Sequence, residues 1–171
     1  MKRIITATVN NVSGVLNRVT GMLARRGYNI ESITVGHTEN PKISRMTFVV
    51  VVDTPKNIEQ VLKQLNKQVD VLKVSDITDE SIVSRELALI KVFATPQQRG
   101  ELAAVINPFR ASILDVGRET MTVQVTGDNQ KIEALIDLLH PYGIKEIART
   151  GITAFKRGHK LVNDQRVHLI N

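Results

Sequence analysis

The chain has 171 residues, of which 42% are hydrophobic, so it can build one ordinary core or two small ones, and its composition argues against wholesale disorder. It contains no cysteine, which excludes disulfides, thiolate zinc sites and cysteine nucleophiles and suits a reducing compartment. The net charge of +6 comes from scattered basic residues, and no apolar run approaches the roughly 20 residues that span a bilayer. We therefore expect a cytoplasmic protein that has a modestly basic surface and does not enter membranes.

The first half of the chain predicts the order strand, helix, two strands, helix, strand. Alternating β-branched residues indicate the strands, and apolar residues at helical spacing indicate the helices. Gly27 is typical of a helix stop, and Thr54-Pro55 is typical of a helix start, because proline tolerates the first helical position. The predicted strands cover residues 2–9, 30–36, 43–52 and 69–75, and the predicted helices run from residue 15 to Gly27 and from Thr54 through residue 65.

The second half repeats this order. Thr95-Pro96 predicts a helix start, with Gln98 placed for a capping box, and Asn107-Pro108 predicts the end of that helix. The predicted strands cover residues 86–94, 111–117, 120–126 and 147–155, and a second helix covers 132–139 before His140-Pro141 and Gly143. The repeat predicts an α+β protein of two tandem ferredoxin-like βαββαβ units, each an antiparallel sheet with two helices on one face.

The polar segment 76–84 separates the two halves and is typical of a domain boundary. We expect one unit at residues 1–78, a second at 79–158, and a tail at 159–171 to which the sequence assigns no role. The predicted strand 46–52 is apolar on both faces, so each face needs a cover. The sequence therefore favours pairing of sheets or of sheet edges in a homodimer.

The ends of the first predicted helix indicate a site for a small zwitterion. Asn11 and Gly14 precede the helix, whose free N–H groups and partial positive charge suit a carboxylate. Asn29 follows the helix, and its amide oxygen can accept a hydrogen bond from an ammonium group. Apolar neighbours, Val15, Leu16 and Ile30, can surround an aliphatic side chain. In a dimer, one end from each chain can form the site; the simpler interpretation is a helix cap and a helix stop.

Other kinds of site find little support in the sequence. No nucleophile, acid–base pair or glycine-rich phosphate loop is set up, and the four histidines lack metal-ligand spacing, so we expect neither catalytic nor metal-binding residues. The polar turn from His37 to Ser44, with Arg45 at its end, is a candidate contact for a protein partner, with an ordinary exposed loop as the alternative.

Three segments resemble a known family. Residues 11–16 (NVSGVL), 26–32 (RGYNIES) and 44–47 (SRMT) resemble the ACT domain of the small regulatory subunit of acetolactate synthase (acetohydroxyacid synthase). The resemblance extends over about residues 1–158 and includes Arg149-Thr150-Gly151, while the segment after Gly158 departs from it.

The resemblance implies a regulatory subunit without activity of its own. It implies a catalytic large subunit that carries thiamine diphosphate, magnesium and FAD and condenses two pyruvates, or pyruvate with 2-oxobutyrate; this chain itself holds no cofactor. It also implies feedback inhibition by valine bound between two ACT domains, with contacts at Asn11, Gly14, Asn29 and Ile30. The sequence does not rank valine over isoleucine or leucine.

Two other functions fit the predicted fold. One is an ACT sensor for another biosynthetic enzyme or for a transcription factor. The other is an RNA-binding module of the same βαββαβ order, which needs aromatic residues on two central strands to stack bases. Residues 4–9 contain none and residues 46–52 contain only Phe48, so we expect no nucleic-acid partner.

Overall fold

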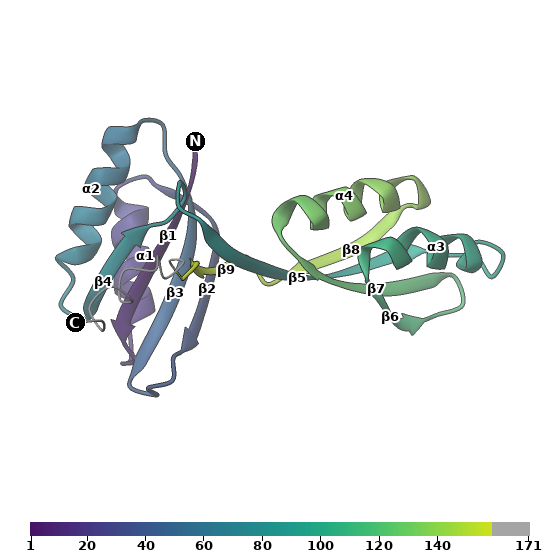
Figure 1. The fold of residues 1–171 in the computed structure, drawn as a ribbon, viewed down its shortest axis with the longest axis horizontal. Helices are drawn as coiled ribbons and strands as arrows, with labels where there is room; N and C mark the ends of the chain where they lie inside the picture. Colours follow the sequence, from purple (N-terminus) through teal and green to yellow (C-terminus); the bar gives the residue numbers. More distant parts are fainter. Residues whose placement is uncertain (159–171) are drawn as a thin grey trace, which may run out of the picture.

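The computed structural model describes residues 1–158, which form two βαββαβ units joined by one long strand, β5 (Figure 1). In the first unit, neighbouring strands pair antiparallel in the order β2-β3-β1-β4, and both helices lie on one face of the sheet (Figure 1). Its elements are β1 (Lys2–Asn10), α1 (Val15–Arg25), β2 (Asn29–His37), β3 (Ile43–Val51), α2 (Pro55–Asn66) and β4 (Val71–Asp76).

The second unit has the same topology, with strand order β6-β7-β5-β8 and a short ninth strand paired with β5. Its elements are β5 (Ile82–Phe93), α3 (Arg99–Ile106), β6 (Ser112–Val116), β7 (Thr120–Gly127), α4 (Asn129–Leu139), β8 (Ile144–Arg149) and β9 (Thr153–Lys156). Two 3-10 turns, Asn107–Phe109 and His140–Tyr142, end α3 and α4 at the prolines. The predicted tandem α+β fold is therefore confirmed.

Each unit has its own aliphatic core between its sheet and its helices. Alternate residues of β1, such as Ile5, Ala7 and Val9, are fully buried against the apolar stripe of α1. In the second unit, Ala88, Ile90 and Val92 of β5 have the same role. The period of two along the strands thus determines which face of each sheet packs against the helices.

The strands at the junction of the units differ from the prediction. β5 begins at Ile82 rather than at residue 86, because Ile82–Arg85 pairs with β9 before the strand continues into the second sheet. The predicted strand 147–155 is two strands, β8 and β9. Gly151 lies between them with φ 81°, a left-handed conformation that ends β8 and redirects the chain.

The start of α3 also differs from the prediction, at Arg99 rather than at Thr95-Pro96. The amide oxygen of Gln98 accepts hydrogen bonds from the backbone N–H and the hydroxyl of Thr95, at 3.1 and 3.0 Å. The Thr95 hydroxyl is therefore engaged with a side chain, so it caps no helical N–H group. Residues 95–98 consequently form a turn that precedes the helix.

The outer face of the first sheet, which points away from α1 and α2, is partly covered by the chain itself. Thr47 and Val49 point to this side and are nonetheless buried. The connection between β8 and β9 lies there, and the hydroxyl of Thr34 donates to the carbonyl oxygen of Ile152 at 3.0 Å. The connection between β8 and β9 thus covers part of a face that we expected another sheet or a second chain to cover. Pairing of two chains stays a prediction, and the predicted tail 159–171 lies outside the described residues.

Candidate functional site

The loop before α1 is held by Asn11. Its backbone N–H donates to the carbonyl oxygen of Lys42 at 2.8 Å, and its side-chain Nδ2 donates to that of Pro41 at 2.9 Å. These bonds fix the loop against the turn between β2 and β3. Within residues 1–158 the Oδ1 atom of Asn11 has no hydrogen-bond donor, so it can accept a bond from a ligand.

Gly14 precedes α1 with φ 79°, and no side chain caps the helix there. The positive φ favours glycine here, because a Cβ would strain the backbone; the nearest atom to such a Cβ is Nη1 of the flexible Arg18 side chain, at 3.2 Å. The first turn of α1 contains no acidic residue. Val15 is buried in the core, whereas Leu16 is exposed beside the loop. This end of α1 therefore presents uncapped N–H groups beside an apolar side chain, a combination that suits an amino-acid carboxylate.

The other end of α1 leads into β2. The N–H of Gly27 donates to the carbonyl oxygen of Ala24 at 2.9 Å, and Gly27 has φ 75°, so the helix ends at a glycine cap as predicted. Asn29 is exposed at the first position of β2, and Ile30 is half-buried against the core. Asn29 thus offers an amide to solvent beside an apolar side chain.

One chain alone does not bring these two ends together. The 11 residues of α1 span about 16 Å at 1.5 Å per residue, more than one small amino acid can bridge. However, β2 is an edge strand that α1 contacts, and Val35 on this strand and Leu16 on α1 are both exposed. An antiparallel pair of β2 strands would place the start of α1 from one chain near Asn29 of the other.

His37 and Arg45, the candidate partner contacts, lie at one surface hollow. Both residues are exposed and line a cavity of about 350 Å³ at the end of β2, together with Thr38 and Glu39. The turn itself is fixed by hydrogen bonds from the N–H of Thr38 to the carbonyl oxygen of Ile43, at 2.9 Å, and across residues 38–42. The turn is therefore a defined surface.

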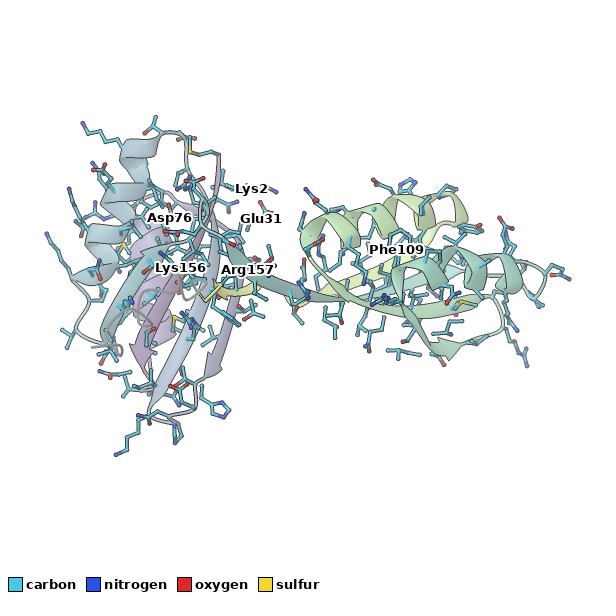
Figure 2. The ribbon with its side chains drawn as sticks, viewed as in Figure 1. Lys2, Glu31, Asp76, Phe109, Lys156 and Arg157 are labelled. Atoms are coloured by element: carbon cyan, nitrogen blue, oxygen red, sulfur yellow. The ribbon has the colours of Figure 1, made fainter. Side chains whose placement is uncertain are left out.

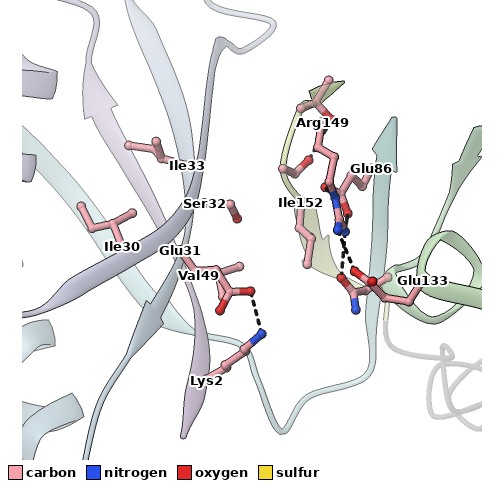
Figure 3. Close-up of a pocket in the computed structure, with 13 residues that line it drawn as sticks. Lys2, Ile30, Glu31, Ser32, Ile33, Val49, Glu86, Glu133, Arg149 and Ile152 are labelled. Atoms are coloured by element: carbon pink, nitrogen blue, oxygen red, sulfur yellow. Dashed lines mark hydrogen bonds and ion pairs between the residues drawn. The ribbon is translucent and has the colours of Figure 1, made fainter. Parts of the chain in front are cut away.

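A larger cavity, of about 690 Å³, lies between the two units (Figure 3). On one wall, Arg149 donates to both carboxylate oxygens of Glu86 at 2.8 Å and to Glu133 at 2.6 Å. On the other wall, Lys2 pairs with Glu31 at 2.7 Å. The hydrogen bond to Glu86 raises the pKa of Arg149, although burial opposes it, so the guanidinium stays charged. Two ion-pair groups thus face each other across the junction.

The Arg149 network was not predicted from the sequence. Glu86 is only 4% exposed and occupies the inward position that precedes Ala88, Ile90 and Val92 in the alternation of β5. A carboxylate at an inward-facing strand position is the signal that predicts a buried partner. Arg149 lies in one of the segments that carry the family resemblance. The residues around it in the sequence do not indicate which carboxylates it contacts.

Residues 1–158 show neither a metal-binding cluster nor a membrane-spanning helix. No group of three or more His, Asp or Glu side chains in this range is placed to hold a metal ion. None of the described helices is both long and apolar enough to cross a bilayer.

The fold and the α1 ends define a class: tandem βαββαβ proteins in which a helix terminus and an edge strand are available for a small ligand and a second chain. The model for an acetohydroxyacid synthase (AHAS) small subunit-like ACT domain matches residues 5–73, and the model for the small subunit of acetolactate synthase matches residues 85–158. The chain belongs to the family of acetolactate synthase small subunits.

Individual relatives agree with this assignment. The acetolactate synthase small subunit of Bacillus subtilis is 66% identical over 158 residues, which cover 92% of both chains. A probable acetolactate synthase small subunit of Archaeoglobus fulgidus is 55% identical and covers 94% of this chain and 99% of its own. The crystal structure of the small subunit from Thermotoga maritima superposes with a TM-score of 0.83 at 41% identity, covering 94% of this chain and 99% of that one.

Proposed function

We propose that this chain activates a thiamine-diphosphate-dependent catalytic large subunit of acetolactate synthase and makes that enzyme sensitive to valine. Family membership implies the large subunit as a partner. The observation that carries the sensing role is α1, which has an uncapped start next to Gly14 and ends before the exposed Asn29. The chain supplies ligand binding and partner contact, while the condensation of pyruvate, and its cofactors, belong to the large subunit.

The proposed valine site is formed by two chains. The carboxylate binds the free N–H groups at the start of α1 in one chain, where Gly14 allows close approach and Asn11 adds an amide. The ammonium group donates to the amide oxygen of Asn29 in the other chain. Leu16 and Ile30 cover the isopropyl group. Because each chain contributes one end, valine binding is linked to dimerisation.

Inhibition requires that valine binds one state of the complex more tightly than another. Strand β2 offers a short route from the site to the second unit. Asn29 begins this strand, a bulge follows between Ile30 and Ser32, and Ser32 then lies against Gly151. We propose that valine at Asn29 shifts β2 and thereby changes the orientation of the second unit on the first.

The hollow at His37 and Arg45 is the proposed contact with the large subunit. Both side chains are exposed, and they border the same cavity at the end of β2. This position is next to Val35 and hence to the proposed dimer edge. A contact here would therefore be affected by any shift of β2.

Titration calorimetry of the full chain with valine tests the site. We expect binding to the wild type and none to Gly14→Asp, because aspartate adds a negative charge and a Cβ where the carboxylate is held. Gly100→Asp is the matched control, since Gly100 has open space and lies in α3 of the second unit. Absence of binding at millimolar valine, or equal binding by Gly14→Asp, would contradict the proposal.

For the RNA-binding alternative, Phe48 is the one aromatic residue in the two predicted central strands that could stack a base. Phe48 is completely buried in the core of the first unit, so it cannot stack a base. A sensor for a different enzyme is distinguished by pull-down: this chain should retain the acetolactate synthase large subunit.

A further inference from the structure

The outer face of the first sheet carries an arranged set of basic and hydroxyl side chains. In the strand register, Thr8 of β1 lies between Arg45 of β3 and Lys73 of β4. One row further along, Thr6 lies between Thr47 and Ser75. Side chains at directly paired positions of a sheet point to the same face. The register therefore places one cation on each side of the Thr8 hydroxyl.

These side chains line a surface hollow with a volume of about 310 Å³. Thr6, which is only 5% exposed, lines it, and so do Phe155 and Lys156 of β9. Figure 2 shows Lys156 beside the first sheet. The full lining consists of Thr6, Thr8, Arg45, Lys73, Ser75, Ile77, Phe155 and Lys156. Among residues 1–158, the lining of the hollow therefore combines three cations and three hydroxyls and includes no carboxylate.

Two of the three cations form no ion pair with the residues that the structure describes. Lys156 pairs with Glu80 at 2.8 Å. Arg45 and Lys73 make no ion pair with any residue among 1–158. Two strand spacings separate them, roughly 10 Å between backbones, so both long side chains can reach a small anion above Thr8. At this separation two exposed like charges repel each other only weakly in water, so both side chains can turn toward one anion.

We propose that this hollow is a binding site for the phosphate group of a small molecule. The guanidinium of Arg45 has the planar fork that matches phosphate oxygens, Lys73 adds a point charge, and the hydroxyls of Thr8 and Ser75 can donate to the remaining oxygens. The site lies on the opposite face of the sheet from α1, so it is separate from the proposed valine site. It would give the small subunit a second effector.

Calorimetry or NMR titration of the full chain with inorganic phosphate at low ionic strength tests the proposal, because salt screens such contacts. We expect Arg45→Gln and Lys73→Gln each to weaken phosphate binding about tenfold. Thr8→Val, which keeps the β-branched shape, should weaken it about threefold. The control is the double variant Lys67→Gln/Arg118→Gln, which removes two exposed charges elsewhere and should bind as the wild type does.

Three results would overturn the site: no phosphate binding at millimolar concentration, an equal loss of binding in the control variant, or binding only of an acidic peptide or RNA. Thermal unfolding of each variant verifies that the fold is kept. Arg45 is shared with the proposed large-subunit contact, but phosphate is titrated here into the small subunit alone. Failure of this site would therefore leave valine binding and partner contact untouched.

Discussion

Gly151 of the second unit lies directly against Ser32 of the first. A Cβ at position 151 would be 3.0 Å from Cβ of Ser32, and Gly151 has φ 81°. The neighbouring hydrogen bond from Thr34 to Ile152 ties the same two segments together. The two units therefore touch where β2 leaves the proposed valine site, and glycine is required at that contact for both space and backbone conformation.

Replacing Gly151 by alanine should destabilise the chain. The left-handed backbone costs roughly 1–2 kcal/mol for a residue with a Cβ, and the short distance to Ser32 adds to it. Urea unfolding of the full chain measures the loss. Gly36→Ala, on the same strand β2 but with open space, should change stability far less. A loss in Gly36→Ala equal to that in Gly151→Ala would show that the contact has no special role.

The ion pair between Glu86 and Arg149 should stabilise the second unit more than the pair between Glu133 and Arg149. Glu86 is buried and accepts two hydrogen bonds from the guanidinium, whereas the Glu133 side chain is 47% exposed. We expect Glu86→Gln to cost roughly 1.5–3 kcal/mol and Glu133→Gln less than about 1 kcal/mol, measured by urea unfolding. Equal losses would contradict this ranking, because the buried pair would then stabilise the unit no more than the exposed one.

Asp76 should make stability depend on pH in the acid range. Burial raises the pKa of its carboxyl, but hydrogen bonds from Thr78 and Arg3 more than offset this, so the pKa lies below its usual value. The stabilisation is therefore complete above the unfolded-state pKa of about 4 and disappears as pH falls through the lower folded pKa. Asp76→Asn should cost roughly 1–3 kcal/mol at pH 7, and the cost should fall steadily as pH is lowered below about 4. The exposed Asp53→Asn should show no such difference; a pH-independent loss in Asp76→Asn would contradict the ion-pair explanation.

The β2 edge should be the dimer contact. A lysine in place of the exposed Val35 puts a charge into the predicted contact, so Val35→Lys should give more monomer than the wild type in sedimentation at micromolar concentration. Leu72 is also exposed but lies on β4, at the opposite edge of the same sheet. Leu72→Lys should therefore sediment as the wild type does. A wild-type monomer, or a monomer only with Leu72→Lys, would contradict this arrangement.

Local patterns predicted most of the fold. The alternation around Ile5, Ala7 and Val9 predicted β1, and Gly27 predicted the end of α1. The pairing of Val83 with Phe155 was not predictable, because it joins distant parts of the chain and depends on the left-handed turn at Gly151. A glycine in a sequence allows such a turn but does not require it.

The residues of the candidate sites were likewise predicted only in part. Helix-end signals identified Gly14 and Asn29, and the structure places both at the ends of α1. Arg149 meets Glu86 and Glu133 only because β5, α4 and β8 fold together, which no spacing in the sequence shows. The row formed by Arg45, Thr8 and Lys73 likewise depends on strand register.

The most direct test of the account is acetolactate formation from pyruvate by the purified large subunit of the same organism, with and without this chain and with and without valine. We predict that the chain raises turnover, that millimolar valine lowers turnover again, and that Gly14→Asp still activates but no longer responds to valine. No activation by the chain, or equal inhibition by valine in the wild type and Gly14→Asp, would contradict the account.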